Sequence, residues 1–386
     1  MEKVKHILKK ILYVVANKTE GNNHFLLENI NCNLVVSQKK VLLCYLDYYQ
    51  ASQALNDKGT HTNYREFFQI MNNLIHLNCV IDVCFCNYDI SEQELKDKNY
   101  DFIFGFGQAF RKASEYCKNA KKILYMTENP YYISKEREHE RINYYEKRMG
   151  KKCDFSRTGV YYLDDDIKTA DIVVSLGETK YYRIFKKETY RIFPTGLKNE
   201  SFQFDFSKKE KNKFVLFGAG GIVHKGIDIL VEVFAKHPEW TLYMCGGNIT
   251  NGIEDLAYKV PSNCIDMGYV KVESDEYIKI VEQCVYCLLP SCSEGMSTGL
   301  ITCMNHGVIP VVTRGNGFDD LENYTEYFED FHIEEIEKNL IELVKGPMNI
   351  LEEKAKCVME YANTEFTLEQ YTKRMQEILK ECMGEA

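Results

Sequence analysis

A glycine-rich loop and the lysine that follows it are residues of this chain that could take part in chemistry. Gly218, Gly220 and Gly221 lie in a turn directly after the apolar run 214–217, and Lys225 follows shortly afterwards. Backbone amides at such a turn, with the dipole of the next helix behind them, form an anion site, and a lysine adds a mobile positive charge. Tight turns also need glycine for backbone reasons alone, so by itself the loop leaves phosphate binding and a plain turn equally open.

A second loop of small residues contains an acidic side chain. It spans residues 290–297, after the apolar run 285–289. From the acid onward its residues are Glu294, Gly295, Met296 and Ser297. The carboxylate can accept hydrogen bonds from ligand hydroxyls while neighbouring amides face the same ligand. Both loops follow predicted strands, so we expect them at the carboxyl edge of one sheet, where ligands bind in doubly wound folds.

Length and composition limit the kind of protein that contains these loops. The chain has 386 residues, more than one hydrophobic core usually organises, so two domains with a cleft between them are expected. Apolar residues make up 45% and charged residues 27%, which predicts a folded, soluble, cytoplasmic protein. The net charge of −9 argues against nucleic acid as a partner. The 15 cysteines, an odd number in a long chain, favour reduced and buried thiols.

Short apolar and β-branched runs in the first half of the chain predict buried strands. They are residues 41–45, 80–85, 102–104, 123–126 and 172–175. Apolar residues at helical spacing, from Phe67 to Ile75, separate the first two runs and predict a strand, helix, strand unit. Alternation of this kind indicates an α/β fold with a parallel sheet covered on both faces.

A similar series follows a charged segment at residues 198–212, in which we place the interdomain linker. Its strands are predicted at residues 214–217, 242–245, 285–289 and 308–312. Two Rossmann-like domains are therefore expected. The predicted divisions are a basic amphipathic helix at 1–18, an acceptor-side domain at 19–196, a ligand-binding domain at 197–366, and a helix at 367–386 that crosses back to the first domain.

Four stretches of the second half resemble a known family. They are residues 224–228, 267–270, 289–295 and 306–312. In their order and spacing the sequence resembles the retaining glycosyltransferases of family 4, which have the GT-B fold of two Rossmann-like domains facing across a cleft. The resemblance implies that Lys225 contacts the phosphates of a nucleotide diphosphate sugar and that Glu294 binds hydroxyls of its sugar. Residues 214–320 would then be the nucleotide-sugar-binding half of a glycosyltransferase.

The sequence departs from the family pattern at two places. Thr302 stands where the family commonly has a second glutamate that contacts the ribose, and Gly220 or Gly221 stands where an arginine is frequent near the phosphate loop. Ribose recognition and the identity of the nucleotide are therefore open. A catalytically silent subunit of a glycosyltransferase complex and a nucleotide-sugar epimerase remain as alternatives. A dinucleotide-dependent dehydrogenase is disfavoured, because no acidic residue follows the first loop in the expected pattern.

Candidate cleft residues of the first domain lie in two loops. Gly59 and Thr60 precede the helix through Phe67, where GT-B enzymes often have a loop that faces the donor, but Thr60 is equally a helix cap. Glu128 and Asn129 leave the predicted strand 123–126 at its cleft end, and they are equally turn residues.

Two charged runs are interpreted as structural. The run at residues 136–141 predicts a solvated helix face. The three aspartates at 164–166 predict helix caps and solvent-facing charge rather than a metal site.

The N-terminal segment has a stripe of apolar residues on a basic helix. Residues 3–15 carry this pattern, which is typical of a helix on an anionic membrane surface and, more commonly, of a helix that packs on the first domain. The first alternative predicts peripheral attachment at the inner face of the membrane.

The sequence, with its resemblance to family 4, thus predicts a metal-independent, hexosyl-type glycosyltransferase without a cofactor, and the resemblance implies that it is retaining. It would move a sugar from a nucleotide diphosphate sugar to a glycan or lipid-linked glycan in surface polysaccharide or glycoconjugate synthesis. The predicted catalytic residues are Lys225 and Glu294. The predicted donor-binding residues are Gly218, Gly220, Gly221, Lys225, Glu294, Gly295, Met296, Ser297 and Thr302.

Overall fold

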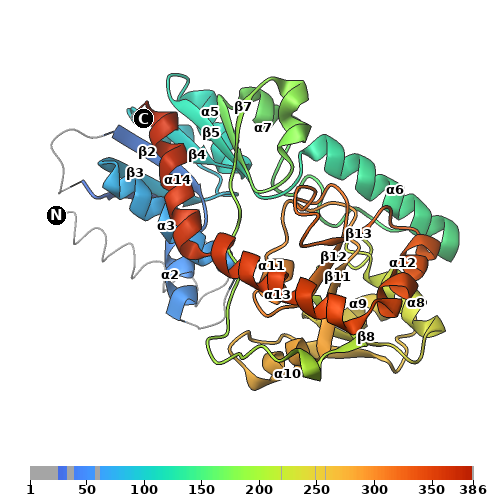
Figure 1. Cartoon of the computed structure of the whole chain (residues 1–386). Helices are drawn as coiled ribbons and strands as arrows, with labels where there is room; N and C mark the ends of the chain where they lie inside the picture. The colour runs from blue at the N-terminus through green and yellow to red at the C-terminus, as the bar shows by residue number, and fades with distance from the viewer. Residues whose placement is uncertain are drawn as a thin grey trace.

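The strands of this chain form two sheets, each covered by helices (Figure 1). The computed structural model describes residues 25–384 except for 33–38, 57–60, 219, 248 and 257. The amphipathic helix predicted at residues 1–18 lies outside this described part, as do the candidate cleft residues Gly59 and Thr60.

The first sheet has the strand order β1-β3-β2-β4-β5-β6-β7. Its strands are β1 (Leu27–Ile30), β2 (Lys39–Tyr45), β3 (Cys79–Phe85), β4 (Phe102–Gly105), β5 (Lys121–Met126), β6 (Ile172–Ser175) and β7 (Glu188–Arg191). All neighbours are parallel except β1, which pairs antiparallel with β3. Its helices are α2 (Tyr48–Asn56), α3 (Thr62–His76), α4 (Glu92–Leu95), α5 (Gly107–Tyr116), α6 (Tyr131–Met149), α7 (Asp164–Thr169) and the 3-10 helix η1 (Thr179–Phe185). The central strands are continuous apolar runs because helices cover both faces.

The second sheet has the order β10-β9-β8-β11-β12-β13, with every pair parallel. Its strands are β8 (Glu210–Phe217), β9 (Thr241–Cys245), β10 (Cys264–Gly268), β11 (Cys284–Leu289), β12 (Ile309–Thr313) and β13 (Glu326–Phe328). Its helices are η2 (Phe206–Lys208), α8 (Ile227–Lys236), α9 (Ile249–Asp255), α10 (Asp275–Gln283), α11 (Thr298–Met304), α12 (Ile333–Lys345) and α13 (Met348–Glu365). This is the Rossmann order, in which the strand order reverses beside the first strand, here between β8 and β11.

Strand β8 is longer than the sequence predicted. It begins at Glu210, inside the segment predicted as linker, because Glu210 pairs with Cys284 of β11 although its side chain is charged and exposed. All 15 cysteines lie in the described residues, and none forms a disulfide.

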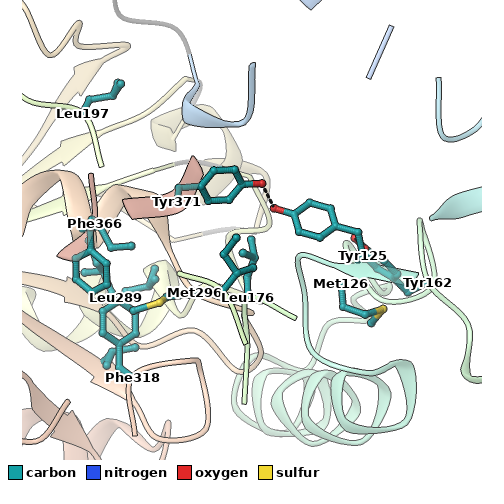
Figure 2. Close-up of a cluster of buried hydrophobic side chains, with 14 of the residues drawn as sticks. Tyr125, Met126, Tyr162, Leu176, Leu197, Leu289, Met296, Phe318, Phe366 and Tyr371 are labelled. Carbon is teal, nitrogen blue, oxygen red and sulfur yellow. Dashed lines mark hydrogen bonds between the residues drawn. The ribbon is translucent and has the colours of Figure 1, made fainter. Parts of the chain in front are cut away.

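The last helix, α14 (Leu368–Met383), returns to the first sheet and lies along α3 (Figure 1). Asn73 of α3 donates its Nδ2–H to the carbonyl of Thr372 at 2.9 Å. Figure 2 shows the hydroxyls of Tyr125, from β5, and Tyr371 facing each other at 3.1 Å within the buried cluster. The predicted return of the C-terminal helix to the first domain is therefore confirmed.

Helix α6 starts from the first sheet but lies along the second domain, beside α8 and α12 in Figure 1. The prediction of a solvated face at residues 136–141 is wrong for one side of this helix. Glu138 and Arg141 are 1% and 0% exposed, because both meet charges of the second domain. Arg141 pairs with Asp228 of α8, and both of their side chains are fully buried. His139 and Glu140, on the opposite side, are exposed as expected.

Candidate functional site

A cavity of about 420 Å³ lies between the two sheets. Ligand pockets in proteins measure about 300 to 1,000 Å³, so this cavity suits a small molecule. The second domain contributes the two predicted loops, which follow β8 and β11 on either side of the switch in strand order. The first domain contributes polar side chains that include His61, Asn63, Glu66, Glu128 and Arg157. The predicted arrangement of two Rossmann-like domains across a cleft is therefore confirmed.

The backbone of the loop after β8 requires glycine. Gly218, Gly220 and Gly221 have φ angles of +133°, +92° and +74°, in the region that favours glycine. A Cβ added at Gly218 or Gly220 would meet no heavy atom within 4 Å, so the backbone there is open to a ligand. Lys225 lies two residues before α8, which begins at Ile227, and the positive end of the helix dipole adjoins the loop. Gly218 and Lys225 line the cavity, as an anion site requires.

Lys225 and Glu294, which come from separate loops, form an ion pair in the cavity. Lys225 Nζ lies 3.0 Å from Glu294 Oε1, and the two side chains are 9% and 10% exposed. Ser291 Oγ donates to the same oxygen at 3.0 Å, and Asn316 Oδ1 accepts the Glu294 N–H at 2.9 Å. Burial raises the pKa of Glu294, but Lys225 and other nearby cations outweigh it and lower the pKa to about 2. The carboxylate is therefore ionised at neutral pH and held in place by the protein.

His224, the residue before Lys225, pairs with Glu138 from the first domain. Its Nδ1 lies 3.1 Å from Glu138 Oε1, and its Nε2–H donates to the carbonyl of Ser293 at 2.6 Å. Both ring nitrogens thus face acceptors, which requires a proton on each. Burial lowers the pKa of His224, but Cys292 and Glu138 raise it by more than burial lowers it, so that the pKa is about 10. This geometry therefore favours a buried imidazolium beside the glycine loop.

Arg157, on the segment between α6 and α7, is a cavity residue that sequence reasoning missed. Its Nη2–H donates to Glu128 Oε1 at 2.7 Å, and the side chains are 33% and 19% exposed. Glu294 is the main influence that raises the pKa of Arg157, since its carboxylate lies in the same cavity. Nothing in the sequence separates Arg157 from surface cations, because only the fold brings it to the second domain.

Two loops from the two domains touch at Asn129 and Gly295. Asn129 is 1% exposed and donates its Nδ2–H to Ser293 Oγ at 3.2 Å and to a backbone carbonyl. A Cβ added at Gly295 would overlap the carbonyl oxygen of Thr127, so glycine permits this close approach. Asn129 therefore joins the domains, whereas Glu128 lines the cavity.

The other predicted donor-binding residues lie at or near the start of α11. Met296 and Ser297 line the cavity, and Ser297 is the N-cap residue of the helix. Thr302 also lines it, but its hydroxyl donates to the carbonyl of Thr298 at 2.7 Å and accepts the N–H of Leu197 at 3.1 Å. Thr302 thus tethers the interdomain segment to α11.

The aspartates at residues 164–166 have structural partners. Asp164 accepts the N–H of Tyr132 at 3.1 Å, and Asp166 accepts the N–H of Leu163 at 2.8 Å at the start of α7. Within the described ranges, no group of three or more His, Cys, Asp or Glu side chains could hold a metal ion. In the same part of the chain, no helix has the length and apolar character needed to cross a membrane.

A second cavity, of about 300 Å³, lies where α14 crosses back over the end of β7. Its lining includes Arg191, Phe193, Gln370 and Arg374. It contains neither the glycine loop nor the Lys225–Glu294 pair, so we assign the candidate site to the cavity between the sheets.

Comparison with known proteins agrees with this geometry. Residues 198–365 match the family model described as glycosyl transferases group 1. A comparison with curated proteins found no significant match.

Solved structures similar to this chain include three enzymes or complexes. Sucrose-phosphate synthase from Thermosynechococcus elongatus has a TM-score of 0.59 at 12% identity, covering 91% of this chain and 100% of that chain. WaaG, a glycosyltransferase involved in lipopolysaccharide biosynthesis, has a TM-score of 0.55 at 14% identity, covering 89% and 100%. HepE from Anabaena, in complex with UDP and glucose, has a TM-score of 0.54 at 13% identity, covering 89% and 100%. At these identities the likeness shows the shared fold.

Proposed function

We propose that this protein transfers a sugar from a nucleotide diphosphate sugar. The premise is that residues 198–365 form a glycosyl transferases group 1 domain within the GT-B fold. The acceptor would be a glycan or lipid-linked glycan in surface polysaccharide or glycoconjugate synthesis. UDP-sugars are the first donors to examine, because the similar HepE structure contains UDP and glucose.

The Lys225–Glu294 pair is the observation that supports this proposal most directly. A cation for phosphate and a carboxylate for hydroxyls lie 3.0 Å apart, on loops that flank the switch point of the sheet. A nucleotide diphosphate sugar carries both chemical groups in adjacent positions. The cavity has room for such a ligand.

Chemistry at this site would depend on stabilising the leaving diphosphate. As the bond between the sugar and the diphosphate breaks, negative charge grows on the phosphate oxygens. Lys225, the amides of Gly220 and Gly221, and the N-terminus of α8 would stabilise that charge. Glu294 would hold the sugar hydroxyls, and the closely packed domains would keep out water that could hydrolyse the donor. Retention of the anomeric configuration and metal independence are part of this proposal.

A screen of nucleotide sugars with purified full-length protein tests the function. Hydrolysis or transfer should fall about 100-fold or more in Lys225→Ala and in Glu294→Ala, because each removes a charged contact to the reacting donor. The matched controls are Lys338→Ala and Glu335→Ala on α12, a pair 3.9 Å apart in which Lys338 is exposed and Glu335 is half-buried; both should leave the rate unchanged. Full activity in both site variants would rule out this site.

The same screen separates the two alternatives. A silent subunit, suggested by Thr302, would bind nucleotide without transfer or hydrolysis. An epimerase would convert the donor into an isomer without an acceptor.

Attachment to the membrane is a separate proposal for residues 1–18. Removing them should abolish sedimentation with liposomes that contain anionic lipids, if the basic stripe at residues 3–15 binds the surface. Unchanged sedimentation would rule out this role.

A further inference from the structure

The segment between α6 and α7 brings an arginine of the first domain to the glycine loop of the second. We infer that Arg157 supplies a second diphosphate-binding cation, in addition to Lys225. The inference rests on the proposed function and adds a residue to its donor site. Arginine suits this role because its planar guanidinium can donate two parallel hydrogen bonds to a phosphate.

The side chain of Arg157 passes directly beside the glycine loop. A Cβ added at Gly221 would lie 2.9 Å from Ser156 Oγ and 3.7 Å from Arg157 Cδ. A larger side chain at Gly221 would therefore compete with Arg157 for the same space. The positive φ of +92° also disfavours any side chain at Gly220. A cationic side chain is thus disfavoured at Gly220 and Gly221. The space beside them is left for a cation from the other domain.

The position of this arginine is tied to the phosphate loop through one buried carboxylate. Glu138 Oε1 accepts the N–H and the hydroxyl of Ser156 at 2.9 and 3.0 Å, and Oε2 accepts the N–H of Thr158 at 3.0 Å. The residues on both sides of Arg157 are therefore held. The same carboxylate pairs with His224, the neighbour of Lys225. One side chain thereby sets the distance between the arginine segment and the lysine.

The partner of Arg157 in this structure can be exchanged for a ligand. Its ion pair with Glu128 is partly exposed, so an incoming anion can compete with the carboxylate for the guanidinium. A diphosphate carries more charge and more acceptor oxygens than one carboxylate. Arg157 also lines the cavity together with Gly218 and Lys225, so a ligand held by the loop lies within the same space.

Calorimetry with UDP, GDP and ADP tests the inference, followed by the monophosphate of whichever base binds best. Arg157→Gln should weaken binding of the diphosphate by about 10- to 100-fold, the range for hydrogen bonds to charged groups, and binding of the monophosphate by less. Lys225→Gln is the positive control. Arg183→Gln, an exposed arginine of the first domain, should leave both affinities unchanged.

Glu128→Gln distinguishes phosphate binding from a structural role. It breaks the same ion pair but keeps the guanidinium, so affinity for the diphosphate should rise because a competing anion is gone. An equal loss in Glu128→Gln and Arg157→Gln would overturn the inference, since the ion pair itself would then be what matters. Unchanged affinity in Arg157→Gln, with a loss in Lys225→Gln, would overturn it while leaving the proposed function. Absence of binding by the unaltered protein would overturn both.

Discussion

The protonated state of His224 should be visible in how stability depends on pH. Its ring is buried, with Nδ1 at Glu138 and Nε2 at a backbone carbonyl, so both nitrogens must carry a proton. Replacing Glu138 with glutamine removes the negative charge and keeps the size of the side chain. The imidazolium then loses its counter-charge, and the folded-state pKa of His224 should fall back toward its ordinary value.

The expected magnitude follows from the pKa. A shift from 6.5 to about 10, at about 1.4 kcal/mol per pKa unit, corresponds to about 5 kcal/mol; Cys292, Glu138 and Glu294 all contribute to it, so Glu138→Gln should lose part of this amount. Because the folded-state pKa is raised, this stability is fully present below pH 6.5 and is lost as the pH rises toward 10. The unaltered protein should therefore exceed Glu138→Gln in stability most at pH 6, and the difference should shrink at each higher pH.

Urea unfolding of both proteins at intervals from pH 6 to pH 9 measures this difference. Other groups titrate in the same range, including Lys209, whose pKa burial lowers to about 8, and Glu66, whose pKa burial raises to about 7. They are common to both proteins, so their contributions cancel in the difference. Glu140→Gln, at an exposed position on the same helix, is the matched control and should show no such trend.

A difference that stays constant from pH 6 to pH 9 would refute this reasoning, because His224 would then be uncharged in the folded protein. Nitrogen NMR of labelled histidine provides a direct check. At pH 8 the ring of His224 should show protons on both nitrogens in the unaltered protein but not in Glu138→Gln.

Three further predictions concern buried polar groups. Arg141→Met or Asp228→Leu alone should destabilise the protein by about 3 to 5 kcal/mol, and the double variant should recover most of this loss in a thermal unfolding series; a double variant as unstable as the singles would contradict this. Glu66→Gln should stabilise the protein at pH 8 by up to about 3 kcal/mol and have little effect at pH 4.5. The reason is that burial raises the pKa of Glu66 to about 7, so deprotonation of this carboxyl opposes folding. Unfolding curves that shift equally at both pH values would refute this prediction. Thr302→Glu should lower stability by more than about 2 kcal/mol without increasing nucleotide affinity, because it buries a charge and removes the bond to Leu197; tighter binding in calorimetry would restore the ribose role.

Local sequence patterns were sufficient for the buried central strands and for the positions of the two candidate loops after β8 and β11. The sequence runs that predicted β2, β5 and β11 are apolar without interruption, because each strand is buried on both faces. The glycines after β8 were recognisable because their backbone requires them. Edge strands such as β1 and β13 were not predicted, since they are short and only partly buried.

Apart from Glu128, the contribution of the first domain to the site could not be derived in this way. Glu138 and Arg141 belong to a charged run that resembles a solvated surface, and their counter-charges lie far along the chain at His224 and Asp228. The helical spacing of Ser134, Glu138 and Arg141 was the available signal. Without knowledge of the opposing surface, that spacing cannot distinguish a buried polar interface from an exposed face.

The packing of helix α6 determines which connections of the chain can bend if the two domains move apart. By sequence it belongs to the first domain, yet Arg141 is paired with α8, Arg148 with Glu232, and the Tyr145 hydroxyl with the carbonyl of Leu256. If one sheet moved away from the other, α6 would move with the second sheet as part of one rigid body. The chain would then bend at four connections: the turn between β5 and α6, the stretch between Thr158 and α7, the interdomain segment before β8, and the turn between α13 and α14. Because Glu138 of α6 holds Ser156 and Thr158 and pairs with His224, Arg157 would stay beside the glycine loop during such an opening and would separate from Glu128 of the first domain.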